Sequence, residues 1–205
     1  MREKKWFPIL YMFIVTAFFS SIVIGVSQFT KQRVVANQKR SFEQAVLAVL
    51  PGAYDVNAGN LELHRRFQEQ IDKPDEFSAG AYTIKKDGRL AAYALPIQGQ
   101  GFWAPIKAVI GVAADKKTIT GVTFYEQKET PGLGAQITTI KFRSQFQGKI
   151  VSTGPKPLSF KRPGDVLGKS DVHAVTGATQ TSARLEKIIN EGLKNWQQKM
   201  AEGAN

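Results

Sequence analysis

The chain has 205 residues, no cysteine and a formal net charge of +11 at pH 7. The absence of cysteine excludes disulfides, thiolate-held iron–sulfur clusters and thioether-attached haem within the chain, so any redox chemistry must come from a bound organic cofactor. His64 and His173 lie far apart without a spaced carboxylate partner, which predicts no metal site, and the basic residues are spread along the chain in a way that argues against nucleic-acid binding.

The first predicted element is a transmembrane helix within residues 1–30. Residues 6–29 contain no charged side chain, and as a helix they would extend about 36 Å, more than the ~30 Å of a bilayer core. A cleaved signal peptide is the alternative, but the apolar run is longer than a typical signal and lacks an Ala-x-Ala site. Basic residues flank both ends in nearly equal number, so charge does not decide the orientation. These residues are Arg2, Lys4 and Lys5 before the run, and Lys31, Arg33, Lys39 and Arg40 after it.

Residues 31–79 are predicted to form a juxtamembrane helix and a linker region. Val35, Phe42, Val46 and Leu50 recur at roughly helical spacing, and a Pro-Gly pair at 51–52 ends the pattern. Such an apolar stripe more often packs on its own domain than on a neighbouring subunit, which is the other possibility. A short helix is expected around 61–71, followed by a linker through Pro74.

Residues 80–205 are predicted to form an α+β domain, a mostly antiparallel sheet with flanking helices. Strands are expected at 81–85 and 90–97, around an Asp-Gly hairpin signal, and at 106–113 and 118–125. A helix is expected at about 137–146. A last helix, beginning near Ala183, has an apolar face at helical spacing. That face consists of Leu185, Ile188, Ile189, Leu193 and Trp196.

The most informative motif lies just before this last helix, where residues 176–182 read Thr-Gly-Ala-Thr-Gln-Thr-Ser. Its small residues let the backbone approach a ligand, and the free N–H groups of a helix N-terminus attract an anion. The pattern therefore favours a phosphate site. An ordinary N-terminal cap is the alternative, because Ser and Thr are common there for hydrogen-bonding reasons alone.

Three segments resemble the NqrC/RnfG family of FMN-binding subunits, which occur in the sodium-translocating NADH:quinone reductase and in the Rnf complex. Residues 176–179 are similar to the end of the family's flavin-attachment pattern, Asp-x-x-Ser/Thr-Gly-Ala-Thr. Residues 129–134 read Glu-Thr-Pro-Gly-Leu-Gly, as in a loop of the same family, and residues 99–106 resemble its Gly-rich segment. The resemblance covers roughly residues 80–200. The pattern departs at one position, where His173 stands in place of Asp and Asp171 lies two residues earlier.

The resemblance implies a covalent flavin. By position, Thr179 is the residue that would carry FMN through a phosphoester. The remaining cofactor-binding residues that the resemblance implies are Thr176, Gly177, Ala178, Thr181 and Ser182 around the phosphate, and Thr130, Leu133 and Gly134 beside the ring system.

The implied protein is a membrane-anchored electron-relay subunit of an ion-translocating, NADH- or ferredoxin-linked complex. Its expected partners are the other membrane subunits, a flavin transferase and the lipid bilayer. The family also implies a single pass through the bacterial cytoplasmic membrane, with the FMN domain on the external side. No nucleophile–base pair stands out, so we expect electron transfer without substrate catalysis in this subunit. A sensor that binds FMN reversibly and a flavin-free assembly subunit are the alternatives, and the parent complex, Rnf or quinone reductase, stays open.

Overall fold

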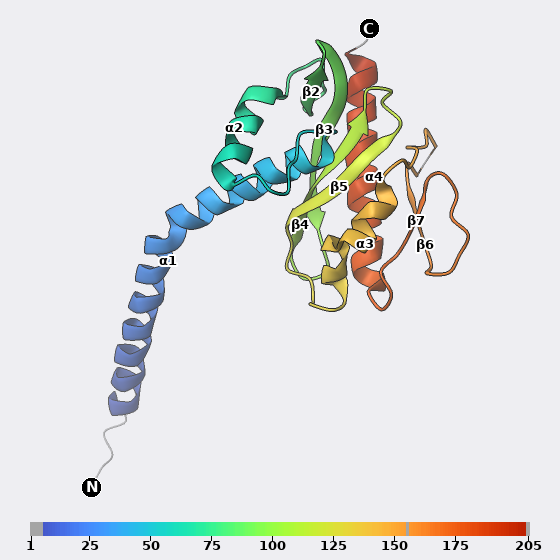
Figure 1. Cartoon of the computed structure of the whole chain (residues 1–205). Coiled ribbons are helices and arrows are strands. Elements are labelled where there is room, and N and C mark those ends of the chain that lie inside the picture. Colours follow the sequence, from blue (N-terminus) through green and yellow to red (C-terminus); the bar gives the residue numbers. More distant parts are fainter. Residues whose placement is uncertain (1–5, 155, 204–205) are drawn as a thin grey trace. The chain divides into compact units, whose positions relative to one another are not determined.

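The computed structural model describes residues 6–154 and 156–203 (Figure 1). Two compact units divide the chain, with the boundary between Lys39 and Arg40. The helix α1 (Trp6–Val49) contributes residues to both units, so the predicted transmembrane and juxtamembrane helices belong to one continuous element. The predicted domain division at residue 80 stays a prediction.

In the first unit, the apolar side chains of α1 from Trp6 to Phe29 are exposed, except that of Val15, which is half-buried. Among the described residues, α1 is the one helix that is long and apolar enough to cross a membrane. An apolar helix with an exposed surface fits a lipid environment, because hydrocarbon replaces the protein core as its surroundings. This agrees with the transmembrane helix that the sequence predicts.

The second unit is built on a five-stranded sheet in which every neighbouring pair of strands is antiparallel. The strands follow chain order: β1 (Ile71–Asp72), β2 (Tyr82–Lys86), β3 (Arg89–Gln100), β4 (Pro105–Ala113) and β5 (Ile119–Glu126). At the β2–β3 turn, Asp87 and Gly88 have φ angles of +53° and +74°, as a two-residue hairpin turn requires. The predicted α+β fold with a mostly antiparallel sheet is confirmed.

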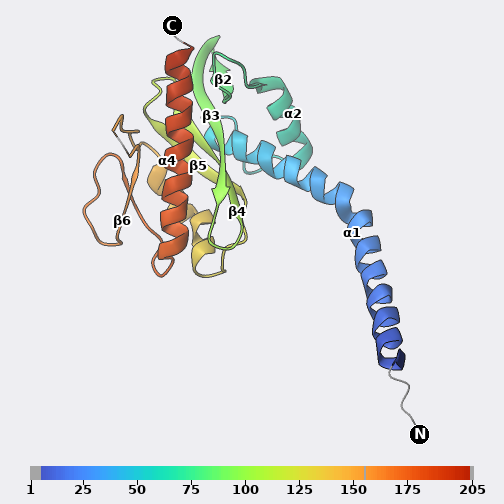
Figure 2. The ribbon, with the colours of Figure 1, turned by 180° about the vertical axis from the view of Figure 1, so that it is seen from behind.

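Helices cover both faces of this sheet (Figures 1 and 2). The helix α4 (Thr179–Glu202) packs on one face, where Leu193 and Trp196 join the cluster that includes Leu95 and Ile97 of β3. Residues 40–49 of α1 and the helix α2 (Asn60–Gln70) cover the other face, where Val46 packs in the cluster of Val109. Of the apolar stripe predicted before residue 51, Phe42, Val46 and Leu50 therefore pack on the domain, whereas Val35 is exposed.

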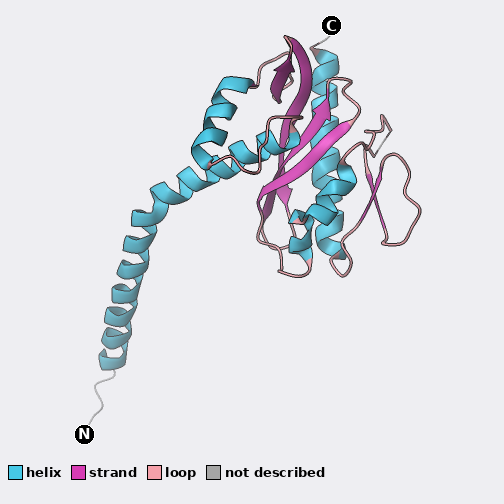
Figure 3. Ribbon diagram, in the orientation of Figure 1, coloured by secondary structure: helices cyan, strands magenta, loops and turns pink. Residues whose placement is uncertain are grey.

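The segment between β5 and α4 differs most from the predicted elements (Figure 3). The helix predicted at 137–146 is divided into the 3₁₀ helix η1 (Gly134–Thr138), the short helix α3 (Ile140–Arg143) and the 3₁₀ helix η2 (Ser144–Phe146). The division falls at Thr139, whose side chain accepts a hydrogen bond from the Phe142 N–H at 3.3 Å and caps α3. A parallel pair, β6 (Ser159–Lys161) and β7 (Asp171–His173), follows. The sequence did not predict these strands, because three residues are too few to show alternation.

Trp196 provides a direct test of this core. Its side chain is 2% exposed, its Nε1 donates a hydrogen bond to the Ser78 carbonyl at 3.0 Å, and its ring packs edge-on against Tyr93. Trp196→Ala is expected to lower the free energy of unfolding by about 3–5 kcal/mol, measured by chemical unfolding of the full chain in detergent. The exposed Lys194→Ala should stay within about 0.5 kcal/mol. Equal stability of the two variants would contradict the packing described.

Candidate functional site

Three segments that are distant in sequence meet at the carboxylate of Glu129, which is 4% exposed. Its Oε1 accepts hydrogen bonds from the backbone N–H groups of Phe102 at 2.8 Å and Trp103 at 3.3 Å. Its Oε2 accepts a hydrogen bond from the Thr181 hydroxyl at 2.7 Å. One side chain thus connects the β3–β4 turn, the loop after β5 and the first turn of α4.

Glycine is required where the backbone approaches this carboxylate. A Cβ on Gly101 would lie 2.5 Å from Glu129 Oε1 and 2.6 Å from the Ala104 carbonyl oxygen. A Cβ on Gly134 would lie 2.5 Å from the Thr181 hydroxyl and 2.9 Å from Glu129 Oε2. Any side chain at either position would displace groups that bind Glu129. Gly101 of the segment at 99–106 and Gly134 of the loop at 129–134 are therefore required for the same reason, their close packing against Glu129.

The loop at 130–134 lies against the turn at 176–179. The N–H groups of Leu133 and Ala135 both donate to the Thr130 carbonyl at 3.1 Å, which folds the loop back on itself. A Cβ on Gly177 would lie 3.4 Å from the Leu133 side chain, so the two segments are in contact there. The Trp103 indole N–H donates to the Thr130 hydroxyl at 3.1 Å. The structure thus brings Thr130, Leu133 and Gly134 beside the Thr-Gly-Ala-Thr turn.

The helix α4 begins at Thr179, four residues before the predicted start near Ala183. The difference comes from the hydroxyls of Thr181 and Ser182, which are both buried. Thr181 donates to Glu129, and Ser182 Oγ accepts from the Val175 N–H at 3.1 Å. Ser and Thr usually favour turns because their hydroxyls compete for the backbone. Here these hydroxyls have tertiary partners, so the residues belong to the helix.

The hydroxyls of Thr176 and Thr179 are in a different situation. Both residues are exposed, and within the described part of the chain neither hydroxyl has a hydrogen-bond partner. Ala178 precedes α4 without a side-chain cap, so its first N–H groups are left for another acceptor. Gly177, with a φ of +74°, turns the chain between the two threonines. Two free hydroxyls and a helix N-terminus are a suitable arrangement for a phosphate.

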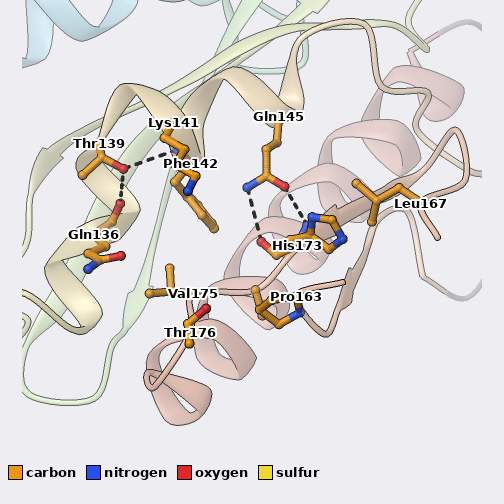
Figure 4. Close-up of a pocket in the computed structure, with 11 residues that line it drawn as sticks. Gln136, Thr139, Lys141, Phe142, Gln145, Pro163, Leu167, His173, Val175 and Thr176 are labelled. Carbon is orange, nitrogen blue, oxygen red and sulfur yellow. Dashed lines mark hydrogen bonds between the residues drawn. The ribbon is translucent and has the colours of Figure 1, made fainter. Parts of the chain in front are cut away.

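A cavity of about 440 Å³ adjoins this turn at Thr176 (Figure 4). Phe142, Val175 and Leu167 provide apolar surface, while Gln136 and Lys141 bring polar groups to the same space. Its volume lies within the range of pockets that hold small organic ligands, roughly 300–1,000 Å³. The sequence did not indicate the lining residues from α3 and from the loop before β7, because only the tertiary fold brings them together.

His173 also lines this cavity. Its backbone N–H donates to the Gln145 side-chain oxygen at 2.8 Å, and its carbonyl accepts from the Gln145 amide at 3.4 Å (Figure 4). The ring nitrogen Nε2 lies 2.9 Å from the Asp165 carbonyl oxygen. Asp171 accepts from the Gly168 N–H at 2.9 Å. Its carboxylate therefore holds the preceding loop.

Exposed aromatic and charged groups border the site. Trp103 is 65% exposed, and its ring packs edge-on against the partly exposed ring of Phe102. The guanidinium of Arg184 lies 5.9 Å from the Phe102 ring centroid, which places a positive charge over an aromatic face. The half-buried pair of Lys107 on β4 and Glu126 on β5 is not part of this border. Lys107 Nζ donates to Glu126 at 2.7 Å, and this hydrogen bond raises the pKa of the Lys107 ammonium group.

The close approach at Gly134 generates a prediction. Gly134→Val is expected to displace Thr181 and Glu129, to lower the free energy of unfolding by about 1–3 kcal/mol, and to speed amide hydrogen exchange in residues 101–104. Gly132→Asn is the matched control, because Gly132 lies in the same loop with nothing near its Cβ position and Asn tolerates its positive φ. Unchanged exchange in the Gly134 variant would show that the three segments are not held together as described.

Comparisons with known proteins find relatives of the region that contains this site. Residues 101–194 match the model of the FMN-binding domain family. The chain is 31% identical over 121 residues to the NqrC protein of the Na(+)-translocating NADH-quinone reductase of Pasteurella multocida, covering 58% of this chain and 45% of that protein. It is 36% identical over 104 residues to the corresponding protein of Vibrio vulnificus, covering 49% and 41%. The chain thus spans less than half the length of these curated relatives.

Two solved structures have a similar fold. The NqrC protein of the Na(+)-translocating NADH-quinone reductase of Parabacteroides distasonis gives a TM-score of 0.67 at 22% identity, covering 82% of this chain and 96% of that one. The NqrC of Shewanella oneidensis gives a TM-score of 0.66 at 22% identity, covering 81% and 99%. Residues 101–194 are thus similar to the FMN-binding domain family, and the fold is similar to that of these two solved NqrC structures.

Proposed function

We propose that the chain is a membrane-anchored electron-relay subunit that carries FMN covalently on Thr179, through a phosphoester. The observation that carries the proposal is the exposed hydroxyl of Thr179 at the first residue of α4, which has no partner among the described residues and lies within the region that matches the FMN-binding domain model. FMN supplies electron transfer when it is bound. The chain supplies the anchor, the phosphate environment and the surface against which the ring system lies, without substrate chemistry of its own.

The phosphate side of the proposed site is the turn at 176–179. The N-terminus of α4, a helix of 24 residues, favours a negative charge near Thr179. Gly177 and Ala178 have minimal side chains, and Thr176 adds a second free hydroxyl. The hydroxyls of Thr181 and Ser182 bind Glu129 and the Val175 N–H, so these two residues stabilise the turn through their buried contacts.

The ring side of the proposed site is the loop at 130–134 and the neighbouring cavity. Leu133 is exposed next to Gly177, so it offers apolar contact close to the anchor. Thr130 lies beside the indole of Trp103, and Gly134 keeps the loop against Thr181. The cavity at Thr176 combines apolar walls with amide and ammonium groups, which suits a flat ring with one polar edge.

A covalent bond suits a flavin site outside the cytoplasm. Reversible binding leaves a site empty when the free ligand is scarcer than its dissociation constant, whereas a covalent cofactor remains bound. Attachment would form a bond between the Thr179 oxygen and the FMN phosphorus while the phosphoanhydride bond of an activated flavin dinucleotide breaks. The other nucleotide half of the donor leaves as a monophosphate and the threonine proton is lost to solvent. Both the donor and the flavin transferase come from outside this chain. His173 replaces the acid of the family's attachment pattern, so the transferase would meet an imidazole at that position.

The relatives from Pasteurella multocida and Vibrio vulnificus support a parent complex of the Na(+)-translocating NADH-quinone reductase type, and the Rnf complex is the alternative. In either case the partners are other membrane proteins of the complex. We propose that residues 6–29 cross the bacterial cytoplasmic membrane once and that the FMN domain faces the periplasm or the cell exterior.

The anchor is tested by Thr179→Ala. In the full chain co-expressed with a flavin transferase, intact-mass measurement is expected to show the wild type heavier by FMN less one water. The Ala variant should lack this addition, because the oxygen of the bond is gone. Gln180→Ala, the exposed neighbour on the same turn, should be loaded normally.

Other outcomes of this measurement separate the alternatives. An Ala variant that keeps the added mass would contradict the assignment of Thr179. Flavin that co-purifies with the wild type but is lost on denaturation would indicate reversible binding. A colourless wild type with no added mass would favour the assembly role.

The orientation is tested with reporters fused after Asn205. Alkaline phosphatase is expected to be active there, and green fluorescent protein exported unfolded should be dark, because the domain is proposed to lie outside the cytoplasm. The same fusions on a chain without residues 6–29 should give the opposite pattern. Bright fluorescence with inactive phosphatase on the full chain would place the flavin on the cytoplasmic side.

A further inference from the structure

Beyond the anchor, we propose that Glu129 is the positioning residue of the flavin site: its buried, charged carboxylate fixes the exposed Phe102–Trp103 edge and the first turn of α4 relative to each other. This inference rests on the proposed FMN function of the same site. Glu129 itself lies beneath the surface, so it acts through the groups that it holds.

The hydrogen bonds of Glu129 match the chemistry of a carboxylate. Two backbone N–H groups and one hydroxyl converge on its two oxygens, and an ionised carboxylate has only acceptor sites to offer. Hydrogen bonds to a charged group are roughly twice as strong as neutral ones. The side chain therefore holds its three partners more firmly than a neutral side chain of the same shape would.

The three partners of Glu129 belong to segments that are distant in the sequence. Phe102 lies 27 residues before Glu129, and Thr181 lies 52 residues after it. The Phe102–Trp103 pair lies in the turn between β3 and β4, beyond the last paired residues of the two strands, Gln100 and Pro105. The hydrogen bonds of the β3–β4 ladder therefore do not hold this pair, and Glu129 binds its backbone N–H groups instead.

The groups that Glu129 holds lie at the edge of the proposed flavin site. On one side it fixes the backbone of Trp103, whose exposed indole reaches Thr130. On the other side it fixes Thr181, in the same first turn of α4 as the anchor Thr179. A rigid aromatic edge at a set distance from a covalent anchor restricts the positions that a flat ring can take between them.

The carboxylate also contributes a negative charge close to the site. A negative charge disfavours the reduced flavin, which gains electron density, so it lowers the reduction potential. Removing the charge while keeping the shape should therefore raise the potential.

Glu129→Gln separates these roles, because Gln has nearly the same shape and can still accept from the two N–H groups. In unloaded full-length protein in detergent, amide hydrogen exchange in residues 101–104 is expected to become about five- to tenfold faster, as a charge-assisted bond becomes neutral. In flavin-loaded protein, the flavin potential should shift to a more positive value, and the loaded fraction measured by intact mass should fall.

Two further variants complete the test. Glu126→Gln removes a carboxylate near the same strand end that pairs with Lys107, and it should leave exchange at 101–104, loading and potential unchanged. Thr181→Val keeps the charge of Glu129 but removes its Oε2 partner. It should speed exchange in the first turn of α4 and lower loading, which tests the positioning role even if the Glu129 variant does not fold.

The results that would overturn the positioning role of Glu129 differ from those that would overturn the proposed function. A wild type without flavin would overturn the proposed function. A wild type that carries flavin, with Glu129→Gln unchanged in loading and potential, would overturn the positioning role even if exchange at 101–104 became faster, since Glu129 would then only stabilise the fold. If Glu129→Gln fails to fold and Thr181→Val loads normally, the positioning role is also overturned.

Discussion

The site depends on one buried carboxylate. Burying a charge is costly unless it is hydrogen-bonded, and the structure meets this requirement by aiming two backbone N–H groups and a hydroxyl at Glu129. Gly101 and Gly134 are constrained by the same contact, since a Cβ at either position would collide with it. The motifs at 99–106, 129–134 and 176–182 are therefore parts of one cluster.

A second constraint is that the sheet has helices on both faces. Ala45, Val46, Leu47 and Val49 of α1 lie in the core of the domain. The Val49 carbonyl accepts a hydrogen bond from the Thr120 hydroxyl at 2.5 Å. On the opposite face, α4 packs through Leu185, Leu193 and Trp196, and its first turn carries Thr179. The position of the proposed anchor thus depends on the packing of a long helix, which is more rigid than a free loop.

Local patterns in the sequence predicted the elements that are fixed by local rules. The Asp-Gly turn, the strand pairs, the amphipathic α4 and the apolar segment of α1 all follow from periodicity and turn chemistry. The contacts of Glu129 could not be predicted in this way, because they join residues 26 to 52 positions apart. The early start of α4 and the division at Thr139 were missed for related reasons, since hydroxyls of Thr and Ser decide both through their specific partners. For the contacts of Glu129, the one signal in the sequence was the position of this residue at the start of the Glu-Thr-Pro-Gly-Leu-Gly motif.

We propose that the hydroxyl of Thr179, at the start of α4, is the flavin anchor. Trypsin should release residues 170–184 as one peptide, because Lys169 and Arg184 are its cleavage sites. Fragmentation of this peptide from flavin-loaded, membrane-purified protein measures which of its four hydroxyl residues in the 176–182 motif carries the added mass. We expect the fragments to gain the mass of FMN less one water at Thr179. An addition at Thr176, Thr181 or Ser182, or an unmodified peptide from loaded protein, would contradict it.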